Sequence, residues 1–189
     1  MKYRETNPII NGYPGYVTVG DVRKPVRTGF RYWMQIALCI EDGAVDTVET
    51  IFSIMDLAQL EPTDLEADLK ALMLFLSGGE QSNDKNEKVI DYQQDAALIV
   101  ASFQQQYGID LTDPKVNMHW WRFLDLLSGL GEETPIMRVI DIRTAELPQG
   151  RDEATRKRRE AMRKAKKKYR LIPRNAEQAF QRDKDIWDG

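Results

Sequence analysis

Apolar residues recur every three or four positions over most of residues 28–147, and this period constrains the fold more than any other feature of the chain. Such spacing lines one face of a helix, whereas a half-buried strand alternates with a period of two. Six stretches show the helical period, and they are separated by glycine, proline or capping residues. The sequence therefore predicts an all-α fold with a single helical domain of about six helices over residues 28–147.

The first 27 residues are expected to differ from this core. They contain prolines and glycines at positions 8, 12, 14, 15, 20 and 25, a spacing that leaves no room for a helix. Val17 and Val19 alternate before Gly20-Asp21, and Val22 follows that pair. Segment 1–27 is therefore predicted to be extended, with a small hairpin across the Gly20-Asp21 turn.

Two further signals mark the limits of the third predicted helix, which is expected between Thr63 and Gly78. Thr63, Asp64, Leu65 and Glu66 are typical of a capping box, in which the hydroxyl and the carboxylate bind each other's backbone donors. Gly78-Gly79 is expected to end the helix. The following stretch, residues 78–88, carries no apolar side chain that could offset the entropy of ordering it, so a mobile loop is predicted there.

Residues 151–170 form a strongly basic segment that follows the end of the apolar pattern at Leu147. The segment holds eleven Lys or Arg and three Asp or Glu, a net charge of +8, which leaves −11 for the rest of a chain whose total is −3. Its composition favours a helical arm about 30 Å long. Residues 171–189 are expected to be a loose tail, and removal of 151–189 is expected to cost little stability. Nine of these eleven basic residues are the candidate contact residues of the arm: Arg156, Lys157, Arg158, Arg159, Arg163, Lys164, Lys166, Lys167 and Lys168.

The basic arm is compatible with three roles: contact with an acidic protein surface, a solvated surface without a specific role, and contact with nucleic acid. The −11 charge of the remaining chain would repel phosphate. The arm has a single aromatic residue, Tyr169, where proteins that bind single strands carry several stacking side chains. A protein partner, or a second copy of the chain, is therefore ranked first and nucleic acid is kept as the alternative.

No residue pattern favours catalysis. Asp91 and Asp95 stand four residues apart, but the carboxylate of Asp95 falls in an apolar register and would be costly to bury without a partner. Arg31 and Arg143 occupy similar registers, so we expect Asp95 to form a structural ion pair with one of them. Cys39 and His119 are the only cysteine and histidine, which excludes metal sites built from two imidazoles or a Cys/His cluster. We expect no enzyme activity and no cofactor.

The segment around His119 carries two adjacent tryptophans. Neighbouring helical residues point about 100° apart, so Trp120 and Trp121 cannot both face the same way. Trp120 shares the stripe of Phe123 and Leu127 and is expected in the core, whereas Trp121 is expected nearer the surface. His119 is expected to be a packed, hydrogen-bonded group. The candidate protein-contact residues are Trp121, Phe180 and Trp187.

The order of several segments resembles the bacteriophage "gene-product fifteen" family of siphophages and prophages. These segments are TGFRYWMQI (28–36), IDYQQDAALIVASFQQQYGIDL (90–111), MHWWRFLDLLSGLGEETPIMRVIDIR (118–143) and the basic helix after residue 150. The resemblance implies a non-enzymatic protein of the tail module, similar in gene placement to tail assembly chaperones. Such chaperones keep apolar tape-measure helices soluble until tail-tube subunits polymerise. The implied partners are the tape measure protein, the tail-tube protein or the chain itself.

The expected compartment is the cytoplasm of the bacterial host. The N-terminus MKYRETNPIING lacks the apolar run of a signal peptide, and no stretch approaches the roughly 18 apolar residues of a membrane span. A membrane is therefore not among the expected partners.

Overall fold

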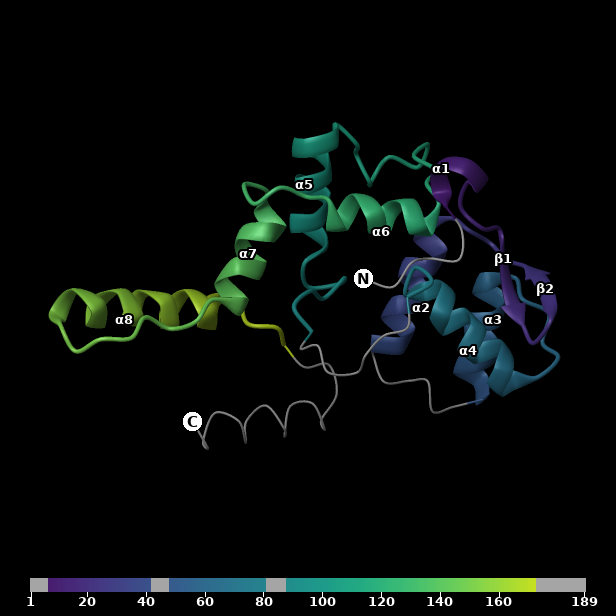
Figure 1. The fold of residues 1–189 in the computed structure, drawn as a ribbon, viewed down its shortest axis with the longest axis horizontal. Coiled ribbons are helices and arrows are strands. Elements are labelled where there is room, and N and C mark those ends of the chain that lie inside the picture. The colour runs from purple at the N-terminus through teal and green to yellow at the C-terminus, as the bar shows by residue number, and fades with distance from the viewer. Residues whose placement is uncertain (1–6, 42–47, 81–87, 173–189) are drawn as a thin grey trace. The chain divides into compact units, whose positions relative to one another are not determined.

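The computed structural model describes residues 7–41, 48–80 and 88–172, which form eight helices and one two-stranded sheet (Figure 1). The helices are α1 (Pro8–Asn11), α2 (Phe30–Glu41), α3 (Val48–Ala58), α4 (Leu65–Leu76), α5 (Ala96–Tyr107), α6 (Trp120–Ser128), α7 (Pro135–Thr144) and α8 (Glu153–Lys168). The chain is mostly helical, as predicted, and the total of eight helices exceeds the expected six because α1 and α8 lie outside residues 28–147. The strands are β1 (Tyr16–Val19) and β2 (Val22–Pro25).

The chain divides into two compact units. The first unit comprises Met1–Asn86 and Pro114–Ser128, and thus contains α1 to α4, the hairpin and α6. The second unit comprises Glu87–Asp113 and Gly129–Gly189, with α5, α7 and α8. Segment 28–147, which the sequence pattern suggested as one core, contributes to both units.

The N-terminal segment contains the predicted hairpin and one helix that was not predicted. β1 and β2 pair antiparallel with Val19 opposite Val22, and Gly20 takes a φ of 59° in the turn between them. The short helix α1 forms because Asn7 caps it by accepting a hydrogen bond from the backbone N–H of Ile9, and because Pro8 suits the first helical turn. The expectation that the breakers exclude every helix was therefore wrong for this single turn, which Gly12 ends.

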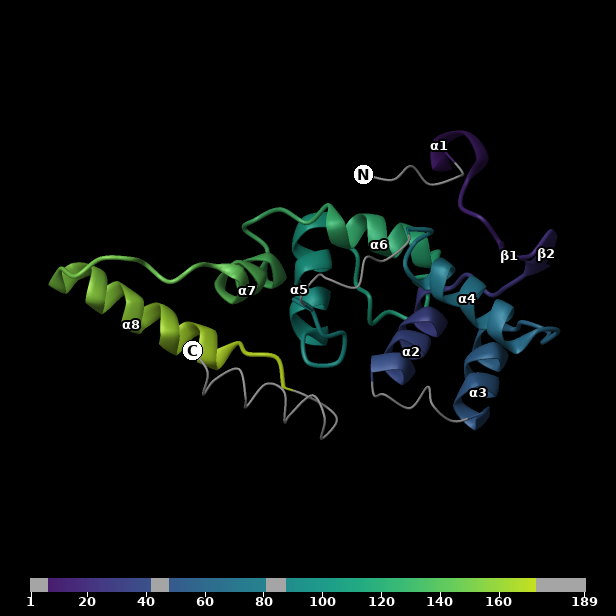
Figure 2. The same cartoon turned by 60° about the horizontal axis from the view of Figure 1, so that its bottom comes forward.

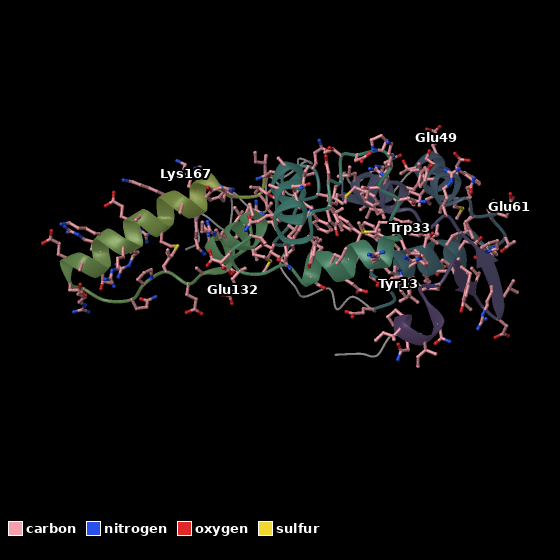
Figure 3. The ribbon with its side chains drawn as sticks, turned by 90° about the horizontal axis from the view of Figure 1, so that it is seen from above. Tyr13, Trp33, Glu49, Glu61, Glu132 and Lys167 are labelled. Atoms are coloured by element: carbon pink, nitrogen blue, oxygen red, sulfur yellow. The ribbon has the colours of Figure 1, made fainter. Side chains whose placement is uncertain are left out.

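Aromatic side chains fill the core of the first unit. The Trp33 and Phe75 rings are stacked 4.4 Å apart between α2 and α4, and Trp33 is completely buried (Figure 3). Phe123 of α6 stacks on Phe30 at 5.6 Å and on Trp120 at 5.3 Å. These ring contacts join three helices into one apolar core.

A short backbone bridge brings residues 114–128 into the first unit. The Phe30 N–H donates to the Met118 carbonyl at 2.9 Å, and the Trp120 N–H donates to the Thr28 carbonyl at 2.7 Å. Helices α2 and α6 therefore both begin at this bridge. The pair Asp113-Pro114 predicts an earlier start of this helix, but α6 starts at Trp120 because the residues directly before it are held in the bridge.

The ends of α4 follow the predicted pattern with one shift. Asp64, and not Thr63, is the N-cap, and its carboxylate accepts from the backbone N–H groups of Glu66 and Ala67. Asp68 completes the cap by accepting from the N–H groups of Thr63 and Asp64. At the other end Gly78 and Gly79 take φ values of 72° and 82° and stop the helix, as expected.

In the second unit α5 packs against α7, and α7 contacts α8. Ser102 links the first pair, because its hydroxyl donates to the Leu98 carbonyl and accepts from the Ile136 N–H. The apolar core of this unit is formed by Ile99, Phe103, Leu111, Leu130, Ile136 and Val139. The helical register that Tyr92 shares with Ala96 and Ile99 predicts a helix from Tyr92, but α5 begins only at Ala96, since residues 92–95 form a turn.

Three sequence-based expectations fall wholly or mainly outside the described residues. They are the end of α2 that Gly43 predicts, most of the mobile loop 78–88, and the tail after residue 172.

Candidate functional site

Asp95 is the buried carboxylate of the second unit, and Arg143 is its partner. The guanidinium Nη1 lies 2.7 Å from Oδ2 of Asp95, and Nη2 lies 2.8 Å from Oδ1. The Asp95 side chain is 2% exposed and that of Arg143 is 9% exposed. The geometry is a two-pronged ion pair of the kind that fixes orientation as well as charge. It joins the turn before α5 to the last turn of α7.

Arg143 also connects this pair to the end of the basic arm. Its Nη1 donates to the Val89 carbonyl and its Nε to the Tyr169 carbonyl, at 2.8 and 2.7 Å. Lys166 of α8 donates in turn to the Arg143 carbonyl at 3.0 Å. The C-terminal end of the arm is therefore part of the hydrogen-bond network of the second unit. The prediction that removal of 151–189 costs little stability did not include these bonds, and it stays a prediction.

Arg31, the other arginine considered for Asp95, is placed in the first unit. Its Nη1 donates to the Val116 carbonyl at 2.5 Å, and its guanidinium lies 4.6 Å from the centre of the Phe30 ring. Arg31 thus supports the segment that leads into α6.

Asp91 and Asp95 act together as a turn and helix cap. Asp91 Oδ1 accepts from the backbone N–H groups of Gln93 and Gln94, at 2.9 and 2.7 Å. Asp95 Oδ2 accepts from the N–H of Asp91 at 3.0 Å. Lys88 adds an ion pair to Asp91 at 3.2 Å. Both carboxylates are committed to backbone donors and cations, which is the structural arrangement that the sequence favoured over catalysis.

His119 is fixed by hydrogen bonds to both ring nitrogens. Nδ1 accepts from the Trp121 N–H at 3.0 Å, so Nε2 carries the proton and donates to the Pro14 carbonyl, also at 3.0 Å. The ring stacks on Tyr13 at 5.0 Å. Burial lowers the pKa of His119, although the bond to Pro14 and the nearby Asp125 carboxylate oppose this shift. His119 is therefore a packed neutral group.

Trp120 and Trp121 are both buried, with exposed fractions of 1% and 7%. The prediction that Trp121 lies at the surface and contacts a partner was wrong. Its ring packs against Phe75 and over Gly79, and its Nε1 donates to the Phe75 carbonyl at 2.8 Å. The C-terminal end of α4 thus covers a face of α6 that the helical period had predicted to be exposed. The other two candidate contact residues, Phe180 and Trp187, lie outside the described residues.

The basic helix α8 has one half-buried stripe and a wide exposed face. The stripe consists of Thr155, Arg159, Met162, Ala165, Lys166 and Tyr169. The exposed face carries Arg156, Lys157, Arg158, Arg163, Lys164, Lys167 and Lys168 (Lys167 is labelled in Figure 3). Lys157 and Lys164 pair with Glu153 and Glu160 on the same helix. Asp152 caps the helix through the Thr155 N–H.

A groove of about 660 Å³ lies in the first unit between β1 and α4, which are neighbours in Figures 1 and 2. Its lining is mostly apolar and small, and Leu74 at the edge is 44% exposed. Lys70 and Glu80 contribute charge at the groove. The lining residues are Thr18, Val19, Gly20, Ala67, Lys70, Ala71, Met73, Leu74, Ser77 and Glu80.

Sequence reasoning missed this groove and the ion pair that joins the hairpin to α4. Lys24 of β2 donates to the buried Asp68 of α4 at 2.5 Å and to the Glu61 carbonyl at 3.1 Å. Burial raises the pKa of Asp68, whereas the hydrogen bonds from Lys24, Thr63 and Asp64 lower it. The hydrogen bonds together outweigh burial, so the pKa of Asp68 lies below its usual value. An aspartate among the apolar residues of α4 was the available signal, and its partner lies 44 residues away.

In residues 7–41, 48–80 and 88–172, no three His, Cys, Asp or Glu side chains come together in a way that could hold a metal ion. None of the described helices has both the length and the apolarity that a bilayer span needs.

The fold is that of a mostly helical protein with a small antiparallel hairpin. A family model described as Bacteriophage Gp15 protein matches residues 16–171, so the chain belongs to this phage family. The match begins at β1 and extends past the end of α8. Neither a curated protein nor a solved structure matches the chain. The resemblance inferred from the sequence is thus confirmed.

Proposed function

We propose that the chain is a non-enzymatic factor of phage tail morphogenesis, a tail assembly chaperone-like protein that binds the tape measure protein, the tail-tube protein or a second copy of itself. Membership of a bacteriophage family supports a role in the phage life cycle. The proposal takes the tape measure protein as the first partner, because the family resemblance implies a partner with long apolar helices.

The groove between β1 and α4 is the observation that carries the proposal. Ala67 and Ala71 are one turn apart on α4, and Leu74 follows at the helical spacing with nearly half of its side chain exposed. Small side chains allow another helix to approach closely, and an exposed leucine gives it an apolar contact. A surface of this kind suits the apolar face of a helix that would otherwise aggregate.

Co-expression of the chain with the tape measure protein tests the proposal. We expect the tape measure protein to stay soluble with the unaltered chain and to precipitate with the Leu74→Glu variant. The matched control is Leu65→Glu, since Leu65 is 41% exposed on the same helix but does not line the groove. Equal solubility with all three chains, or equal loss in both variants, would contradict the proposal.

Nucleic acid binding through α8 is the second candidate. Arg156, Arg163 and Lys167 are exposed along one line of the helix, about 17 Å long at 1.5 Å per residue. Such a row could follow a phosphate backbone. If about six phosphates were neutralised, log K would fall with log salt at a slope near −5. Tight binding to unrelated DNA sequences at near-physiological salt, lost when these three residues are neutralised, would favour this candidate.

A further inference from the structure

A hollow of about 510 Å³ lies between the segment before α8 and the first half of that helix. It is lined by Leu147, Gln149, Gly150, Arg151, Arg159 and Arg163. All six residues belong to one continuous stretch of the second unit. Half of them carry a guanidinium group, and none carries a carboxylate.

Arg159 is held in place at this hollow by the backbone. Its Nε donates to the Pro148 carbonyl at 2.8 Å, and its Nη2 donates to the Gly150 carbonyl at 2.6 Å. A guanidinium has five N–H donors, so three donors of Arg159 remain beyond these two bonds. The side chain is therefore oriented before any ligand arrives, which reduces the entropy that binding would cost.

Arg151 and Arg163 lie at the same hollow without a protein partner among the described residues. Arg163 stands one helical turn after Arg159, so the two side chains share a face of α8. Three cations gathered in this way repel one another, and the repulsion is relieved when an anion binds between them.

The acidic residues near the hollow have partners on α8, and one of them, Asp152, borders Gly150. Asp152 accepts from the N–H and the hydroxyl of Thr155, at 2.8 and 2.6 Å, and these bonds lower its pKa. Glu153 pairs with Lys157, and Glu160 pairs with Lys164. Each of these carboxylates already has a partner of its own.

We propose that this arginine hollow binds a phosphate group. A phosphate offers several acceptor oxygens and more than one negative charge, which matches the planar donor forks of several guanidinium groups. The inference is independent of the groove between β1 and α4 and of any tail protein. The phosphate could be a free or small-molecule phosphate or a phosphodiester of nucleic acid, and the chemistry of recognition is the same for both.

The test is calorimetric titration of the full-length chain with pyrophosphate at constant ionic strength. We expect Arg163→Gln and Arg151→Gln each to weaken binding about tenfold or more, the effect of one lost charged hydrogen bond. Arg156→Gln is the matched control, because Arg156 is also exposed on α8 but does not line the hollow. Its affinity should stay within about twofold of the unaltered chain.

A second titration with a single-stranded oligonucleotide, with and without a terminal phosphate, distinguishes the sources. Binding of both oligonucleotides with the same dependence on Arg163 would assign the site to phosphodiesters. Binding only of pyrophosphate and the terminal phosphate would assign it to phosphate monoesters. Absence of pyrophosphate binding, or equal weakening by Arg156→Gln and Arg163→Gln, would overturn the proposal.

Discussion

Arg143 holds Asp95 through both terminal nitrogens of its guanidinium, across 48 positions of sequence. The same guanidinium donates to the Tyr169 carbonyl, so one side chain ties the start of α5, the end of α7 and the end of the basic arm. An arginine suits this position because its planar fork binds a carboxylate and backbone carbonyls together, which a lysine could not do.

Replacement of Arg143 should be strongly destabilising. Arg143→Ala leaves the buried Asp95 carboxylate without its cation, and we expect the second unit to lose about 3–5 kcal/mol. Native-state hydrogen exchange of the α5 and α7 amides measures this loss. Arg138→Ala is the control on the same helix, because Arg138 pairs with Glu133 on the exposed surface and should cost less than about 1 kcal/mol. Similar costs for both variants would contradict the assignment.

Gly79→Ala should destabilise the first unit more than Gly20→Ala. Both glycines have positive φ values, so each substitution carries a backbone cost of about 1–2 kcal/mol. A Cβ at Gly79 would lie 2.8 Å from the Trp121 ring, whereas one at Gly20 meets nothing within 4 Å. We expect Gly79→Ala to lose about 1–3 kcal/mol more of the unfolding free energy than Gly20→Ala, because the Trp121 ring must move. Urea unfolding followed by tryptophan fluorescence measures the difference, and equal costs would show that Trp121 does not pack there.

Gln59→Gly should be stabilising. Gln59 has a φ of 54° at the end of α3, and the Leu60 N–H that follows bonds to the Met55 carbonyl, as at a glycine-terminated helix. Glycine adopts this conformation without a steric penalty, so we expect a gain of about 1 kcal/mol in the unfolding free energy. The midpoint of urea unfolding reports it, and a lower midpoint in the variant would count against the assigned backbone conformation.

The stability of the first unit should fall on mild acidification. The folded pKa of His119 lies below its usual 6.5, so the unfolded chain takes up the proton first as the pH falls. The contribution of His119 to the free energy of unfolding is therefore complete above about pH 6.5. It is lost as the pH drops toward the pKa of the folded state. Protonation of Nδ1 removes the acceptor of the Trp121 N–H.

Urea unfolding of the unaltered chain and of His119→Gln at several pH values between 7 and 5 tests this linkage. The slope of stability against pH, and not the absolute stability, is the quantity to compare. We expect a shallower slope in the variant. An unchanged slope would show that other groups carry the pH dependence.

The helical period predicted most of the helices because each has an apolar face in contact with a core. It also placed Asp95 and Arg143 inward, where a buried charge requires a partner. The Trp121 prediction failed because the helical period assumes one buried face. α6 is covered on two faces, by Phe30 on one and by Phe75 with Gly79 on another.

Other features depend on contacts that no local pattern contains. The Lys24–Asp68 pair requires the hairpin to lie on α4, and the groove exists only because it does so. The start of α6 depends on a backbone bridge to Gly29, at a distance of 90 positions from His119. Sequence reasoning could identify the basic arm by composition, but its attachment through Tyr169 involves a backbone carbonyl, which any residue type provides.

The proposed function places a tail protein in the groove between β1 and α4. Hydrogen exchange of the chain, alone and in complex with the tape measure protein, tests it most directly because every segment is observed at once. We predict protection at residues 16–20 and 67–80, and loss of that protection in Leu74→Glu but not in Leu65→Glu. Protection confined to α8, with residues 67–80 unchanged by the partner, would contradict the account.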